Sequence, residues 1–255
     1  MASSPRDTSL RPPATAGNGT APPSLPVRLR LLGGFELESG DAAIDLPDHA
    51  QRLLAFLALQ GRTMHRAYVA GRLWPELTEA HAHGCLRTTL WRTGRACGLT
   101  VVAATPTSVG LACDVSVDAR ELETVCEAVF HERDVPTAEE LFVLAHAGEL
   151  LAGWYEDWAD HERERLRLLR LLALEAAAER LLRAGRMTEA SQAALAALAA
   201  DPLRESAHRL LIRAALEEGN VAEALRRFTG LRAELLRELG LEPSEQTREL
   251  LGGLA

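Results

Sequence analysis

The chain has 255 residues and a formal net charge of −8, and all 28 of its basic residues are arginine. The absence of lysine excludes a Walker A nucleotide-binding loop, because that motif needs a lysine to reach the β and γ phosphates. No apolar run approaches the about 18 residues that a transmembrane helix requires, so we expect a cytoplasmic protein without a membrane partner.

The charge is unevenly distributed along the chain. Residues 1–26 have a net charge of +1, residues 27–117 hold nine arginines against eight acids, and residues 118–255 hold 17 arginines against 27 acids. The first range is rich in Pro, Ser, Thr, Gly and Ala, and we expect it to be a disordered tail. The other two ranges are expected to be two domains. A nearly neutral domain can still bind nucleic acid if its positive charge gathers on one face.

The domain at 27–117 begins with a pattern typical of a small antiparallel sheet. Apolar residues alternate with polar ones over 27–31 and 35–37, and turn residues separate these segments. Three helices are predicted next. The first has Asp48 as its N-cap and ends at Gly61, the second is capped by Thr63 and stops at Pro75, and the third covers about 78–97.

Two short strands within LTVVAA and SVGLACDV, joined by the turn TPT, follow the third helix. The order of sheet, three helices and hairpin is that of a winged helix-turn-helix domain. In this architecture the third helix normally enters the major groove of DNA, and the hairpin contacts the minor groove or the backbone.

The third predicted helix has one apolar and one cationic face. Leu86, Leu90 and Cys97 are spaced as its buried face, with Thr93 at the remaining inward position. The opposite face and its flank then carry the candidate DNA-binding residues Arg87, Thr88, Trp91, Arg92 and Arg95. A solvated face with its arginines in water is the alternative interpretation, and the order of the elements favours DNA.

A metal site is the other interpretation tested for this helix, because His81, His83 and Cys85 lie close together in the sequence. Helical residues two positions apart point roughly 200° apart and cannot ligate one ion together. A fourth ligand would also be needed, and the sequence has no second cluster of that kind. We therefore expect no metal and no other cofactor. The four cysteines, Cys85, Cys97, Cys113 and Cys126, show no CxxC pairing and are expected to be reduced thiols.

The range 118–255 is almost continuously helical in its pattern and contains an internal repeat. Gly185 and Gly219 are 34 residues apart, as are Ala190 and Ala224, and 34 residues is the tetratricopeptide period. The expected fold is therefore mainly α (α+β), with a winged helix-turn-helix domain followed by an all-α tetratricopeptide-like helical repeat domain. Because the proline that ends the second copy arrives late, at Pro243, its second helix is predicted to be longer by about two turns.

Two further segments of this range are interpreted as structural. Trp154, Tyr155 and Trp158 are predicted to be an anchor packed under the helices rather than a ligand cage. The alternating charges of HERERLRLLR, residues 161–170, are predicted to be a solvated face with i,i+4 ion pairs. No Ser/His/Asp, Cys/His or paired-carboxylate constellation has a recognisable spacing, so we do not expect an enzyme.

The chain resembles the SARP family of bacterial antibiotic-pathway regulators, in which a response-regulator-type winged helix precedes a bacterial transcriptional activator domain (BTAD). The resemblance covers almost everything from residue 27 to residue 251, and the matching segments within this range include LLGGFEL, QRLLAFLALQGR, LRTTLWR, LLAGWYEDW and LLRELGLEPS.

The resemblance implies a sequence-specific activator that binds direct repeats in double-stranded DNA and contacts RNA polymerase. A homodimer on such direct repeats is our own expectation. The resemblance implies that the five candidate residues of the third helix lie in the recognition helix of the family. It adds Thr107 and Ser108 as DNA-binding residues at the tip of the wing. The chain departs from the family at Thr93-Gly94-Arg95, where Leu-Arg-Arg is typical. This departure leaves an alternative function open: a tetratricopeptide-like protein-interaction module with a decayed winged helix.

Overall fold

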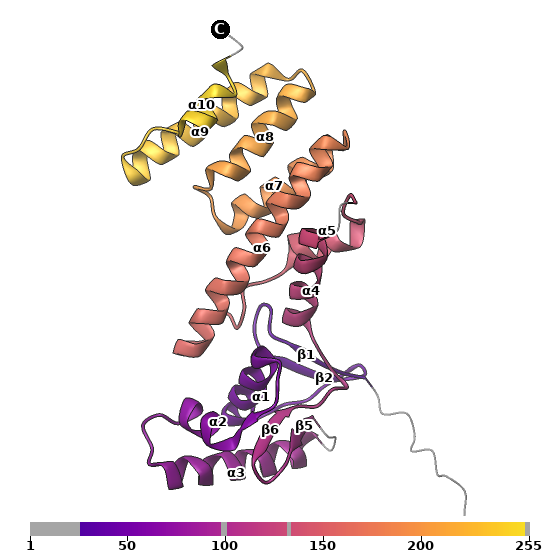
Figure 1. Cartoon of the computed structure of the whole chain (residues 1–255), viewed down its shortest axis with the longest axis vertical. Helices are drawn as coiled ribbons and strands as arrows, with labels where there is room; N and C mark the ends of the chain where they lie inside the picture. The colour runs from indigo at the N-terminus through magenta and orange to yellow at the C-terminus, as the bar shows by residue number, and fades with distance from the viewer. Residues whose placement is uncertain (1–25, 98–100, 132–133, 253–255) are drawn as a thin grey trace, which may run out of the picture.

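The computed structural model describes residues 26–97, 101–131 and 134–252, so the tail predicted at 1–26 lies almost entirely outside the described residues. The described chain is mainly α-helical, as predicted, with small sheets in its first part (Figure 1). The helices are α1 (Asp48–Gln60), α2 (Arg66–Leu73), α3 (Glu79–Cys97), α4 (Asp118–His131), α5 (Ala138–His146), α6 (Asp157–Arg183), α7 (Met187–Ala200), α8 (Glu205–Glu217), α9 (Val221–Leu239) and α10 (Glu245–Glu249).

The described strands form one sheet of order β3-β2-β1-β7 and another of order β4-β6-β5. Their bounds are β1 (Val27–Arg30), β2 (Glu36–Ser39), β3 (Ala42–Ala43), β4 (Met64–His65), β5 (Val102–Ala104), β6 (Ser108–Leu111) and β7 (Val115–Val117). β1 runs antiparallel to β2, with Leu29 opposite Leu37, and parallel to β7, with Leu29 opposite Val117. The predicted strand SVGLACDV, residues 108–115, therefore contains β6 of one sheet and reaches only the first residue of β7 in the other.

The predicted caps of the first two helices are wrong. The N-cap of α1 is Pro47, and Asp48 lies in the first turn, where its carboxylate still interacts favourably with the positive end of the helix. Gly61 ends α1 as predicted, in the left-handed conformation with φ 64°. Thr63 caps no helix, because the next two residues form β4, which pairs with β6, and α2 begins only at Arg66.

The helices after Asp118 follow the predicted 34-residue repeat. Gly185 and Gly219 make the equivalent turns α6–α7 and α8–α9 with φ of 75° and 72°, which favours glycine at both. Ala190 and Ala224 are both buried, so the paired helices approach closely there. The second helix of the second copy is longer, as predicted, but by about one and a half turns and not two, because α9 has 19 residues and α7 has 14.

A single continuous cluster of buried side chains runs from the first sheet into the helical array. Aromatic residues join the two parts: Trp158 meets Phe56 edge to face at 5.4 Å between ring centroids, and Trp154 stacks on Phe35 at 6.1 Å. These two tryptophans form the predicted anchor. Tyr155 does not belong to it, because its side chain points to solvent and is 95% exposed.

The charged segment at 161–170 also differs from the prediction. Arg163 donates hydrogen bonds to the carbonyl oxygens of Leu150 and Leu151, at 2.9 and 3.0 Å, and its side chain is only 19% exposed. The ion pairs within the segment have i,i+3 spacing, as in Arg165–Glu162. Part of this segment therefore fixes the preceding loop instead of forming a solvated face.

Candidate nucleic-acid interface

Helix α3 lies along one end of the elongated molecule, at the opposite end from α8, α9 and α10 (Figure 1). Its buried stripe consists of Ala82, Leu86, Thr89, Thr93 and Cys97. Leu90, predicted to face inward, is only half-buried, because Thr89 occupies the centre of the stripe. The opposite face has no other element packed over it in the described part of the chain, so a partner can reach it.

The structure places the predicted recognition residues on this outward face. Their side chains are all exposed: Arg87, Thr88, Trp91, Arg92 and Arg95. Trp91 is 62% exposed, and the guanidinium carbon of Arg95 lies 5.4 Å from the centroid of its ring. This cation–π contact orients one arginine and one aromatic plane together on the open face of α3.

The arginines of this region lack acidic partners. Between residues 62 and 97 the sequence has six arginines against two glutamates. Within the described ranges, no carboxylate oxygen lies within 4.0 Å of a guanidinium nitrogen of any of the six. These residues are Arg62, Arg66, Arg72, Arg87, Arg92 and Arg95. Their charge is therefore available to an anionic partner.

Most of the other arginines in the described part of the chain do have an acidic partner. Arg28 pairs with Glu121 at 2.9 Å, and Arg52 pairs with Glu156 at 2.7 Å, both at the junction with the helical array. In the array itself Arg204 pairs with a glutamate at 2.7 Å. Although the whole chain has a formal net charge of −8, the α2–α3 end has a local excess of unpaired positive charge.

The turn between β5 and β6 forms the wing and lies beside α2. The backbone N–H of Arg66 donates to the carbonyl oxygen of Thr107 at 3.0 Å, and its side chain donates to that of Thr105 at 3.1 Å. The Thr105 hydroxyl oxygen accepts from the backbone N–H of Ser108 at 3.0 Å. Thr107 is exposed at the tip, whereas Ser108 begins β6 and is half-buried.

A groove separates the wing from the first half of α3. It is lined by His65, Arg66, Ala67, His83, Arg87, Pro106 and Thr107. Sequence reasoning missed Arg66, because no helical face links it to α3; its position follows from the pairing of β4 with β6. The groove brings Arg66 and Arg87 together, two of the unpaired arginines.

The atypical Thr93-Gly94 step is accommodated within α3. The buried Thr93 hydroxyl donates to the carbonyl oxygen of Thr89 at 2.9 Å, so its polar group is satisfied one turn back. Gly94 lies on the exposed side, and a Cβ built there meets no atom within 4 Å. The helix continues through both residues to Cys97.

Other chemistry is not assembled in the part of the chain that the structure describes. His81, His83 and Cys85 belong to no group of three or more His, Cys, Asp or Glu side chains with the geometry to hold a metal ion there. The four cysteines are unpaired within the same ranges. None of the described helices is both long and apolar enough to cross a membrane.

Comparison with known proteins identifies the family of the helical part of the chain. The family model described as the bacterial transcriptional activator domain matches residues 117–254. The regulatory protein AfsR of Streptomyces coelicolor is 31% identical over 212 residues, which cover 80% of this chain and 21% of that protein. AfsR of Streptomyces griseus is 29% identical over 243 residues, covering 89% and 25%. The chain thus spans about a fifth to a quarter of the length of these relatives.

A solved structure shows the same fold. Mycobacterium tuberculosis EmbR, determined in complex with a low-affinity phosphopeptide, superposes with a TM-score of 0.67 at 20% sequence identity. The match covers 88% of this chain and 64% of EmbR. It confirms the predicted architecture of a winged helix followed by a helical repeat.

Proposed function

The chain belongs to the bacterial transcriptional activator domain family, as its resemblance to SARP regulators predicted, and from this membership we propose that it binds specific DNA sequences through α3. In the proposed complex α3 lies in the major groove, and the wing contacts the backbone or the minor groove. Arg87, Arg92 and Arg95 supply contacts to phosphates and base edges. Thr88 and Trp91 add contacts between them, and Thr107 and Ser108 act from the wing.

The observation that carries this proposal is the local excess of unpaired arginine at the α2–α3 end. An exposed arginine that already has a carboxylate partner must give up that partner to bind a phosphate, whereas these arginines have none to give up. Phosphate contacts supply affinity, and a bidentate arginine on a guanine edge supplies specificity. Arg92, on the exposed side of α3, is the residue we propose to read a base.

The site is small, so we propose that two copies act together on a direct repeat. About four phosphate contacts imply a slope near −4 when the logarithm of the binding constant is plotted against that of the salt concentration. Two copies on half-sites spaced by one turn, about 10–11 base pairs, gain avidity from each other. We further propose that the helical array contacts RNA polymerase, as the family resemblance implies.

Selection of bound sequences from random duplex DNA by the full chain tests this function. We expect an enriched motif that occurs twice at one-turn spacing, with tighter binding to the double site than to a single one. Recovery of no motif, together with binding that is equal on all duplexes, would favour the alternative of a protein-interaction module. The observation that favours this alternative is the groove between α5 and α7, where Phe142 is 62% exposed.

A further inference from the structure

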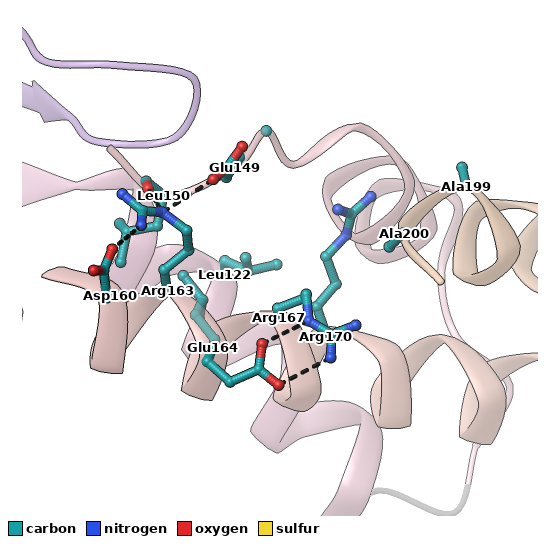
Figure 2. Close-up of a pocket in the computed structure, with 12 residues that line it drawn as sticks. Leu122, Glu149, Leu150, Asp160, Arg163, Glu164, Arg167, Arg170, Ala199 and Ala200 are labelled. Atoms are coloured by element: carbon teal, nitrogen blue, oxygen red, sulfur yellow. Dashed lines mark hydrogen bonds and ion pairs between the residues drawn. The ribbon is translucent and has the colours of Figure 1, made fainter. Parts of the chain in front are cut away.

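A cleft of about 370 Å³ opens where α4, the α5–α6 connection, the first half of α6 and the end of α7 meet (Figure 2). Three leucines form an apolar floor, and two alanines at the end of α7 form one wall; these residues are Leu122, Leu150, Leu166, Ala199 and Ala200. The volume lies at the lower end of the range for small-molecule sites, about 300–1,000 Å³. The size and the apolar floor fit a compact ligand with an apolar body.

The carboxylates that line the cleft already have cationic partners (Figure 2). Glu149 lies 3.0 Å from the Nε of Arg163, which also pairs with Asp160. Glu164 lies 2.8 Å from the Nε of Arg167. Two of the three arginines in the lining are therefore already ion-paired, and their partners are the three acids of the same lining.

Arg170 is the arginine of the lining that no carboxylate neutralises. Its Nε and Nη2 donate to the carbonyl oxygens of Leu144 and Ala145, at 2.6 and 2.9 Å. Considering only the described residues, Nη1 has no hydrogen-bond acceptor, and no carboxylate lies within 4.0 Å of the guanidinium. Burial lowers the pKa of Arg170, yet an arginine stays charged at any physiological pH.

A partly buried cation without a counter-ion attracts an anion, because desolvation strengthens the interaction and hydrogen bonds to ionised groups are the strong ones. We propose that this cleft binds a small organic acid, whose apolar body lies on the leucine floor and whose carboxylate accepts hydrogen bonds from Arg170. The ligand's carboxylate supplies Arg170 with the anionic partner that the other two arginines of the lining already have. The proposed acid-binding cleft does not depend on DNA binding, so an experiment that contradicts one of these two proposals leaves the other unaffected.

Isothermal titration calorimetry of the full chain tests the site with octanoate, decanoate and 2-naphthoate, each against its neutral amide. We expect at least one acid to bind at least tenfold more tightly than its amide, because only the acid compensates Arg170. Arg170→Gln keeps hydrogen-bond donors but removes the charge, so it should reduce the acid-to-amide ratio to near one. Arg165→Gln is the matched control, because Arg165 pairs with Glu123 and Glu162 and does not line the cleft.

Arg170 also donates hydrogen bonds to the end of α5, so Arg170→Gln could lose binding by disturbing the fold. A second variant tests the cleft without removing Arg170. Ala199 is exposed at the rim, and Ala199→Trp should fill the cleft and weaken binding of the acid at least tenfold without removing any charge. Three acids that bind no better than their amides would overturn the proposal. The proposal would also be overturned if one of these acids still bound at least tenfold more tightly than its amide in both Arg170→Gln and Ala199→Trp.

Discussion

Gly148 lies directly against the backbone of Gly33, and a Cβ at position 148 would lie 2.9 Å from the Gly33 nitrogen and 3.1 Å from its Cα. Two backbone hydrogen bonds next to this contact flank the antiparallel bridge between Leu32 and Leu150. The N–H of Gly33 donates to the carbonyl oxygen of Glu149 at 2.7 Å, and that of Leu151 donates to Leu31 at 2.7 Å. The α5–α6 connection is thereby joined by backbone hydrogen bonds to the segment that follows β1 in the winged helix.

Replacing Gly148 by Ala should therefore lower the free energy of unfolding by about 1–3 kcal/mol, because backbone atoms must shift to admit the methyl group. Urea unfolding followed by circular dichroism measures the change. Gly230→Ala is the control: it lies in the middle of α9 with open space around its Cβ, and it should gain about 0.5–1 kcal/mol. Equal stabilities for Gly148→Ala and the parent would show that this contact is looser than described.

Glu175 should make the helical array sensitive to acid. Burial opposes its ionisation, but hydrogen bonds from Arg204, at 2.7 and 3.0 Å, and from Ser206 outweigh burial and lower the pKa. A pKa that is lower in the folded state stabilises the fold above the ordinary glutamate value of about 4.3. This stabilisation is lost as the pH falls through the folded value.

Glu175→Gln should therefore cost about 1–2 kcal/mol at pH 7, where Arg204 loses its carboxylate partner, and progressively less below about pH 4. Thermal unfolding across this pH range measures the difference. Glu189→Gln, which breaks only the exposed i,i+3 pair with Arg186, should leave the stability near that of the parent. A constant difference between Glu175→Gln and the parent from pH 7 to pH 3 would contradict the assigned pKa direction.

The cysteines should differ sharply in reactivity. Burial raises the pKa of the Cys126 thiol to about 12, with a smaller contribution from Glu123, so almost no thiolate forms at neutral pH. Cys113 is exposed and unpaired within the described ranges. Iodoacetamide should modify Cys113 in the native protein and Cys126 only in denaturant, as mass spectrometry of the peptides will show. Equal native-state rates at both positions would mean that α4 opens readily.

Gly94 is expected to limit both the stability and the affinity of α3. Gly94→Ala should stabilise the helix by about 1 kcal/mol without changing the salt dependence of DNA binding. Gly94→Arg should add tighter binding and a steeper salt slope, because the new guanidinium lies on the exposed side near Arg95. If Gly94→Arg stabilises the protein but leaves DNA binding unchanged, this side of α3 does not face DNA.

The sequence predicted those features that depend on local periodicity. The order of α1, α2 and α3, the cationic face of α3 and the 34-residue repeat all follow from spacing within one or two helices. β4 was missed because its two residues form a strand only by pairing with β6, more than 40 positions later in the chain. Nothing near Met64 in the sequence signals that partner.

The roles of Tyr155 and Arg163 were missed for a related reason. An aromatic cluster and an alternating charge pattern are read from side-chain type, whereas burial depends on which neighbouring element covers each position. Trp154 and Trp158 face the first sheet and α1, but Tyr155, between them, points to solvent. Arg163 turns back to the loop carbonyl groups that precede α6.

The affinity of Arg92→Ala for the selected duplex tests the proposed docking of α3 most directly. Fluorescence anisotropy over a series of salt concentrations measures it, with Arg237→Ala, an arginine of α9 at the other end of the molecule, as the control. We predict a loss of about 1–3 kcal/mol for Arg92→Ala, with relaxed preference at one base position, and parental binding for Arg237→Ala. Parental affinity and specificity for Arg92→Ala would contradict the docking of this face of α3 in the major groove.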